Sequence, residues 1–141
     1  EQADCLVCSH VLEHVHQPLH LLALLLAALK PGGVLLLSAP NASSHLRRHY
    51  GEHWRGLEAP RHLAIPDATW LRGWMQGQGF ACTQIPSHPL ETATESERMR
   101  RRALTTGPAD VQAARAVLRG MAPATLAEQD VVQLVCQRAK P

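Results

Sequence analysis

The chain has 141 residues, of which 45% are hydrophobic and 18% are charged, and its formal net charge is +2 at pH 7. This length and apolar content suffice for one buried core, so we expect residues 1–141 to form a single domain. The small charge provides no strong attraction to nucleic acid or to an anionic membrane surface, and neither partner is expected.

The first residues, Glu1–Asp4, are acidic and polar, which is not typical of a signal or transit peptide, and we expect a cytoplasmic protein. The apolar segment Leu19–Leu29 is far shorter than the ~20 residues that a bilayer-spanning helix needs. It therefore predicts a buried helix. Because strand-like sequence begins at once, without an initiator methionine, we expect the chain to be the second part of a longer protein.

The four cysteines are Cys5, Cys8, Cys82 and Cys136. The first two form a Cys-x-x-Cys inside an expected strand, where residues three apart point to opposite faces. A second closely spaced pair, as in a zinc site, is missing. We therefore predict structural thiols and no disulfide, as is usual for a cytoplasmic chain.

The first expected strand, Asp4–Ser9, leads into a turn, and Pro18 fits the first turn of a helix that continues to Leu29. That helix carries only His20 as a polar side chain. Either both of its sides are covered, or one side is an exposed apolar patch that can pair with another copy.

The next strand is expected over Val34–Ala39, after a helix stop at Lys30–Gly33. Its apolar run is unbroken, which favours a strand covered on both faces, as in a parallel sheet flanked by helices. An α/β sheet of this kind binds ligands at the carboxyl ends of its strands.

A long connection, His45–Ile65, follows this strand, and all five aromatic residues of the chain lie between Tyr50 and Phe80. Loops of this length are usually functional or mobile. The remaining elements are expected to be a helix over Leu71–Gln76, a strand over Ala81–Ile85, helices over Glu91–Leu104 and Asp110–Arg119 within a helical insertion at 86–128, and a last strand over Asp130–Gln137.

Several motifs together resemble the second half of a class I S-adenosylmethionine-dependent methyltransferase. They are Ser-His-Val-Leu-Glu-His-Val at Ser9–Val15, then Pro18, Leu-Lys-Pro-Gly-Gly at Leu29–Gly33, Pro40-Asn41, the stretch His53–Leu63, Gly79-Phe80 and the valine-rich last strand. The resemblance implies a partial Rossmann-like α/β methyltransferase fold, with a mixed sheet of about four strands and flanking helices.

The glycine-rich cofactor loop of that family precedes the region that this chain resembles. The only Gly-Gly here, Gly32-Gly33, follows a helix and enters a strand, which is the reverse of a nucleotide loop. We therefore expect the intact protein to transfer a methyl group from S-adenosylmethionine to a small-molecule acceptor. The chain as given is expected to bind that cofactor weakly or not at all, and to be inactive alone.

The resemblance implies residues of the cofactor site, and the position of the long connection at the carboxyl end of a central strand suggests the substrate side. The turn Cys8, Ser9, His10 and Val11 would lie beside the methionine part of the cofactor, although Ser9 could simply cap the turn. Trp54, Arg55 and Arg61 are the substrate-binding candidates, because aromatic rings can stack on an acceptor and arginines can hold a carboxylate or phosphate. Trp54 could instead plug the loop onto the sheet. His53 or His62 is the candidate general base.

The spacing His10-x-x-Glu13-His14 also resembles relatives with Glu-x-x-Glu-His that are thought to bind a divalent metal, with a further histidine that His62 could supply. We favour the alternative that Glu13 and His14 form a helix entry, where the carboxylate complements the positive end of the helix dipole. No metal is predicted, and a metal-dependent hydrolase remains a third alternative.

The second alternative is a non-catalytic, self-associating interaction module. A homodimer could form through the helix at Leu19–Leu29 or through the unpaired edge of the first strand.

Overall fold

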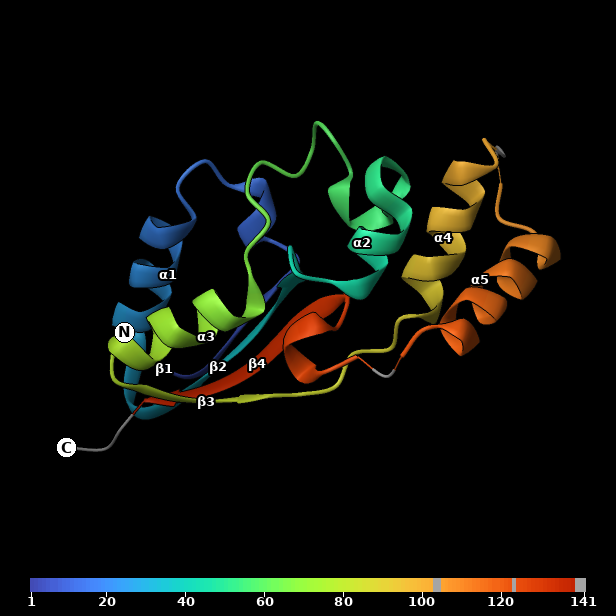
Figure 1. Ribbon diagram of the computed structural model, residues 1–141. Coiled ribbons are helices and arrows are strands. Elements are labelled where there is room, and N and C mark those ends of the chain that lie inside the picture. Colours follow the sequence, from blue (N-terminus) through green and yellow to red (C-terminus); the bar gives the residue numbers. More distant parts are fainter. Residues whose placement is uncertain (103–104, 123, 139–141) are drawn as a thin grey trace.

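A mixed four-stranded sheet in the order β1-β2-β4-β3 runs through the protein. The computed structural model describes residues 1–102, 105–122 and 124–138 (Figure 1). β1 pairs in parallel with β2, whereas β4 runs antiparallel to both β2 and β3. The mixed sheet of four strands confirms the predicted fold class. The strands are β1 (Ala3–Ser9), β2 (Leu29–Pro40), β3 (Phe80–Gln84) and β4 (Val131–Arg138).

Two helices, α1 (Pro18–Ala27) and α3 (Ala68–Gly77), cover one face of this sheet (Figure 1). The other helices gather beyond the end of the sheet where β4 begins. They are α2 (His45–Tyr50), α4 (Leu90–Arg100) and α5 (Pro108–Gly120), and the short 3-10 turns are η1 (Leu12–His14), η2 (Gly51–His53), η3 (Arg55–Leu57) and η4 (Leu126–Glu128). The last part of the helix expected over Glu91–Leu104 lies outside the described residues.

The prediction that the strand after Gly33 is covered on both faces is wrong. Leu35 and Leu37 are buried against the helices, but Leu36 is 38% exposed and its neighbour on β1, Val7, is 67% exposed. The reason is that α1 and α3 lie on the same side of the sheet. Alternate side chains of β2 therefore point to a face that no described helix covers.

The predicted helix stop at Lys30–Gly33 is an irregular start to β2. The pairing with β1 jumps from Ala3 opposite Leu29 to Cys5 opposite Val34, so the extra residues bulge out of the sheet. Gly32 has a positive φ of 80°. A Cβ on Gly33 would lie 2.9 Å from the carbonyl oxygen of Lys30, so the bulge needs both glycines.

Helix α1 has one covered side and one exposed side, which decides between the two alternatives that its apolar sequence allowed. Leu22 and Leu26 are buried in the core, whereas Leu19 and Leu24 are 44% and 55% exposed. One side is therefore an exposed apolar strip. No helix in the described part of the chain has the length and apolar character that crossing a bilayer requires.

The connection His45–Ile65 is more ordered than the long loop that was predicted. It begins with α2, because the hydroxyl of Ser44 accepts hydrogen bonds from the backbone N–H groups of Leu46 and Arg47 at 3.0 and 3.4 Å. Ser44 is thus a helix-start signal in the sequence, at a position where no helix was expected.

The prediction of no disulfide is also wrong, because Cys82 and Cys136 are joined by a disulfide bond. The two residues lie directly opposite each other on the antiparallel strands β3 and β4, with Cα atoms 4.1 Å apart. Cys5 and Cys8 are free thiols, as predicted. Cysteines 54 residues apart gave no sign of their pairing in the sequence.

Candidate functional site

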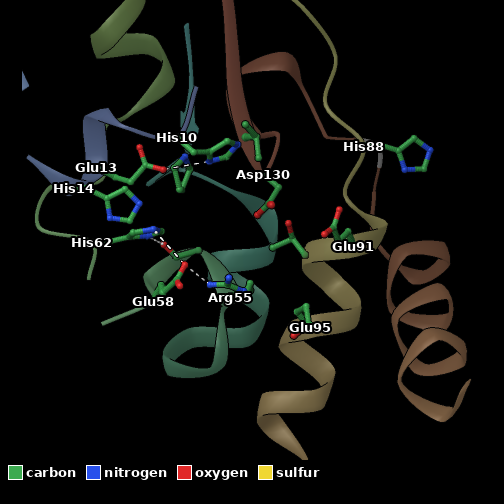
Figure 2. A pocket seen from close by; sticks show the side chains of 14 residues that line it. His10, Glu13, His14, Arg55, Glu58, His62, His88, Glu91, Glu95 and Asp130 are labelled. Carbon is green, nitrogen blue, oxygen red and sulfur yellow. Dashed lines mark hydrogen bonds and ion pairs between the residues drawn. The ribbon is translucent and has the colours of Figure 1, made fainter. Parts of the chain in front are cut away.

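A cavity of about 350 Å³ lies where β1 and β2 end and β4 begins (Figure 2). Because β1 and β2 are parallel, their carboxyl ends meet at this edge of the sheet, the usual ligand position in open α/β sheets. The turn after β1 with η1, and the connection after α2, close it on one side, and α4 closes it on the other. Its polar lining consists of His10, Glu13, His14, Arg55, Glu58, His62, His88, Glu91, Thr92, Glu95 and Asp130.

The turn after β1 brings His10 to the cavity. The backbone N–H of His10 donates to the carbonyl of Ser38 at 2.9 Å, and the hydroxyls of Ser9 and Ser38 lie 2.8 Å apart. His10 then adopts a positive φ of 52°, which few residues other than glycine favour. This turn directs the imidazole of His10 toward Glu13, whose Oε1 lies 3.2 Å from Nδ1.

Glu13 is fully buried, and its second carboxylate oxygen, Oε2, has no hydrogen-bond partner in the described structure. Burial is the largest single influence and raises the pKa of Glu13, but the hydrogen bond from His10, a backbone hydrogen bond and the nearby His10 and His62 together outweigh it, so the pKa is lowered overall. The hydrogen bond between the two side chains also raises the pKa of His10. Glu13 therefore carries a buried negative charge that is only partly satisfied.

Two further histidines on this side of the cavity, His14 and His62, are each held by a backbone carbonyl group. Nδ1 of His14 lies 3.1 Å from the carbonyl oxygen of Arg61, and Nδ1 of His62 lies 2.7 Å from that of Gly56. Because a carbonyl oxygen only accepts, each Nδ1 must be the donor. The two rings lie edge to face with centroids 4.7 Å apart, and Figure 2 shows both beside Glu13.

Glu58 links the floor of the cavity to two arginines. Its carboxylate accepts a hydrogen bond from Arg55 and lies 2.6 Å from Nη1 of Arg61, while Nε2 of His62 is 3.4 Å away. The hydrogen bond from Arg55 is the main reason that the pKa of Glu58 is lowered. Arg55 and Arg61 are thus already paired within the chain.

Asp130 lies at the back of the cavity, just before β4. Its Oδ1 accepts the indole N–H of Trp54 at 2.7 Å and the hydroxyl of Ser44 at 3.1 Å. Burial raises the pKa of this carboxyl group, although these hydrogen bonds oppose the change. Asp130 thereby connects the wall of the cavity to the aromatic residue beneath it.

Of the predicted site residues, His10, Arg55 and His62 line the cavity. Trp54 has no exposed surface, so the structure supports the alternative that it plugs the loop onto the sheet. The others lie outside the lining: Cys8 is buried, Ser9 pairs with Ser38, Val11 is 42% exposed, Arg61 has a 72% exposed side chain and His53 lies 3.7 Å from Glu52.

Three buried or half-buried acids, Glu13, Glu58 and Asp130, were not predicted as site residues. The interpretation of Glu13 as a helix-dipole partner does not fit, because α1 begins only at Pro18. The available signal was the spacing of Glu13 and His14 together with a later histidine. Chemically, the cavity offers four imidazoles, several carboxylates and one guanidinium, which suit proton transfer, cation binding or a polar ligand.

The family model described as methyltransferase domain matches residues 1–85, which is more than half of the chain. Among solved structures, the YcgJ protein from Bacillus subtilis aligns with a TM-score of 0.52 and 11% identity, over 99% of this chain and 65% of that one. The [4+2]-cyclase SpnF aligns with a TM-score of 0.54 and 15% identity, over 99% and 51%. The chain thus spans between half and two thirds of their lengths. No curated protein matches it.

Proposed function

The chain belongs to the methyltransferase domain family, and from this premise we propose that the intact protein transfers a methyl group from S-adenosylmethionine to a small-molecule acceptor. The family match carries this proposal, because fold alone does not define an activity: the neighbour SpnF is a [4+2]-cyclase. The position of the cavity at the carboxyl ends of β1 and β2 supports a ligand at this edge.

We propose that the cofactor lies beside the turn Cys8–Val11 and that the acceptor enters the cavity. The cofactor supplies an electrophilic methyl group, whose carbon bonds to the acceptor as its bond to the sulfonium sulfur breaks. The chain contributes mainly by holding the acceptor in place. Of the two candidate bases, His62 is favoured over His53, because His62 lines the cavity and can accept a proton at Nε2.

We further propose that this polypeptide is the carboxyl-terminal part of the methyltransferase domain. Its sequence has no glycine loop that follows a strand and opens a helix, and the exposed side chains of Val7 and Leu36 leave an apolar sheet face that a preceding segment could cover. The turn at Ser9 and His10 is then only one part of a cofactor site. We also retain residues 86–128, with α4 and α5, as a helical insertion.

The experiment is isothermal titration of this chain with S-adenosylmethionine, beside the same chain extended by its upstream coding sequence. We expect no micromolar binding and no methyl transfer by the short chain, and both properties in the extended one. Micromolar affinity of the short chain would refute the incomplete cofactor site. An extended protein that neither binds nor transfers would refute the proposed activity.

A self-associating module is the second candidate, since Leu19 and Leu24 on α1 are exposed. Light scattering across a range of protein concentrations tests it. A dimer that Leu24→Lys abolishes would support this function, whereas a strict monomer would remove it.

A further inference from the structure

We propose that the acceptor carries a positively charged nitrogen group, an ammonium or a guanidinium, which the acidic lining of the cavity holds. This inference rests on the proposed function, because it names the chemical class of the molecule that enters the same cavity. The acidic lining consists of Glu91 and Glu95 on α4 together with the buried Glu13 and Asp130. Figure 2 shows Glu91 and Glu95 on the opposite side of the cavity from Glu13.

The balance of charge in the cavity favours a cation over an anion. Among the described residues, five carboxyl groups and one guanidinium line it. That guanidinium, on Arg55, donates a hydrogen bond to Glu58, and Nη1 of Arg61 lies 2.6 Å from the same carboxylate. The two arginines that the sequence suggested as holders of a carboxylate or phosphate are therefore already engaged. An anionic ligand would be repelled by the remaining carboxylates, whereas a cationic ligand would be attracted.

The two glutamates of α4 contribute negative charge that the chain neutralises only in part. Glu91 and Glu95 are four residues apart, so they are neighbours on one face of the helix, where like charges repel. The carboxylate of Glu95 lies 2.9 Å from Nε of Arg98. The carboxylate of Glu91 makes no ion pair or hydrogen bond with the part of the chain that the structure describes. A cationic ligand beside these side chains would relieve the repulsion.

The buried carboxyl groups are an independent observation that points to a ligand. Glu13 and Asp130 line the cavity although only 0% and 4% of their surface is exposed. Oε1 of Glu13 lies 3.2 Å from Nδ1 of His10, whereas Oε2 has no partner within the described residues. A buried carboxylate oxygen without a partner is costly. Ammonium and guanidinium groups carry donors and no acceptor, so they would satisfy such an oxygen without bringing an unpaired acceptor of their own.

Helix α4 is a wall of the cavity that lies outside the family match. The match ends at residue 85, and α4 begins at Leu90. The carboxyl ends of β1 and β2 and the turn that carries His10 lie inside the match. The choice of acceptor in this chain then depends on Glu91 and Glu95 as specificity-determining residues, while the matched region supplies the position for the transfer.

The test is a nuclear magnetic resonance titration of the chain with three probes of equal carbon number: diaminobutane, butanediol and succinate. EDTA is present throughout, so that no metal ion enters the cavity. We expect the diamine to bind about tenfold more tightly than the other two, since hydrogen bonds to charged groups are the stronger ones. Its binding should shift the backbone signals of α4 and weaken with added salt. The inference is overturned if butanediol or succinate binds as tightly as the diamine, or if none of the three binds.

Glutamine variants locate the charge that attracts the diamine. Glu91→Gln, which leaves the pair of Glu95 and Arg98 in place, should weaken binding of the diamine about threefold, and the double variant with Glu95→Gln about tenfold. The matched control is Glu52→Gln, which removes the same charge from an 87% exposed side chain outside the cavity lining and should leave the affinity unchanged.

The variants also separate binding from helix stability. Because Glu91 lies in the first turn of α4, where a carboxylate stabilises a helix, circular dichroism verifies that each variant is folded. A folded double variant that binds the diamine as tightly as Glu52→Gln does would overturn the inference.

Failure of this inference and failure of the proposed function give different results. If the extended chain transfers methyl groups but the diamine has no preference over butanediol and succinate, the activity stands and the cationic acceptor is refuted. If the diamine binds through Glu91 and Glu95 but the extended chain transfers no methyl group, the cavity takes a cation and only the proposed activity is refuted.

Discussion

The two hydrophobic clusters of this protein are held together in different ways. The sheet core, formed by the buried faces of the strands with α1 and α3, consists of aliphatic side chains such as Leu35, Leu71 and Leu134 on regular elements. The Trp54 cluster, formed by Leu46, Tyr50, Trp54, Ala93 and Ala114, is smaller and lies beside the cavity.

Buried polar contacts distinguish the Trp54 cluster from the sheet core. The indole of Trp54 donates to Asp130, and the hydroxyl of Tyr50 donates to Glu97 at 3.1 Å. Apolar packing tolerates changes of similar volume, but a buried hydrogen bond requires both partners in place. The Trp54 cluster beside the cavity therefore tolerates fewer substitutions than the sheet core, as expected where side chains must be positioned for function.

The largest effect should come from reduction of the Cys82–Cys136 disulfide. This bond joins β3 to β4 and closes the segment that carries α4 and α5 into a loop. With a sequence separation of 54 between the cysteines, the loop-closure model predicts a loss of about 4 kcal/mol in the free energy of unfolding. Denaturant unfolding with and without dithiothreitol measures it.

The matched control for the disulfide is the double variant Cys82→Ala, Cys136→Ala, whose stability should not respond to the reductant. If the unmutated chain is equally insensitive, the bridge adds nothing measurable to the stability of the sheet core.

The next largest effect should come from Gly56→Ala, which targets the Trp54 cluster. A Cβ on Gly56 would lie 2.2 Å from the indole ring of Trp54, so the ring must shift. Overpacking of this kind costs about 1–3 kcal/mol in the free energy of unfolding. The same substitution at Gly73, where a Cβ meets no atom within 4 Å, should stabilise α3 by about 0.5–1 kcal/mol.

Opposite signs at these two glycines, measured by thermal or urea unfolding, would sharpen the contrast between the two regions. Equal and small effects at both positions would mean that the indole of Trp54 is not tightly packed.

The sheet core was the predictable part of the molecule. The apolar run Val34–Leu37, the apolar residues within 131–135 and the proline at Pro18 are local signals for β2, β4 and α1. The starts of α1 and β4 lie close to their expected bounds, whereas β2 begins five residues earlier than expected, at Leu29. What the sequence could not show was which face of the sheet is covered, because an unbroken apolar run looks the same when one side is exposed. The Cys82–Cys136 pair likewise depends on the register of β3 against β4.

The site was predictable only in part, because its geometry depends on contacts between distant segments. His10, Arg55 and His62 were found through motifs, and all three line the cavity. The burial of Trp54 against Asp130, 76 residues away, has no local signal. The unpartnered oxygen of Glu13 also becomes visible only when its surroundings are known.

A smaller effect is expected from the pH dependence of the Asp130 contacts. Burial raises the folded-state pKa of Asp130 above its ordinary value of 3.8, while Trp54 and Ser44 donate to its carboxyl group and the nearby His10 favours its charge. The folded chain therefore binds this proton more tightly than the unfolded chain does. The resulting stabilisation is fully present below pH 3.8 and is lost as the pH rises through the folded pKa.

The variant Asp130→Asn should lack the pH-dependent stabilisation that Asp130 provides. As the pH rises from 3.8, the unmutated chain should therefore lose unfolding free energy relative to this variant. Urea unfolding over this pH range measures it. A difference that stays constant would show that Asp130 does not titrate differently in the folded chain.

The smallest effect is expected at Glu128, on the solvent side of the Trp54 cluster. The pKa of Glu128 is lowered to about 2. The main cause is the hydrogen bond from the hydroxyl of Thr125, followed by the backbone of Thr125 and by Arg48. A lowered pKa contributes stability that is present above the ordinary value of 4.5 and lost as the pH falls through about 2. Because solvent screens these contacts, Glu128→Gln should remove only a small part of the acid sensitivity. If Glu128→Gln altered the pH dependence of the unfolding free energy more than Asp130→Asn does, surface contacts rather than buried ones would determine the pH dependence of stability in this region.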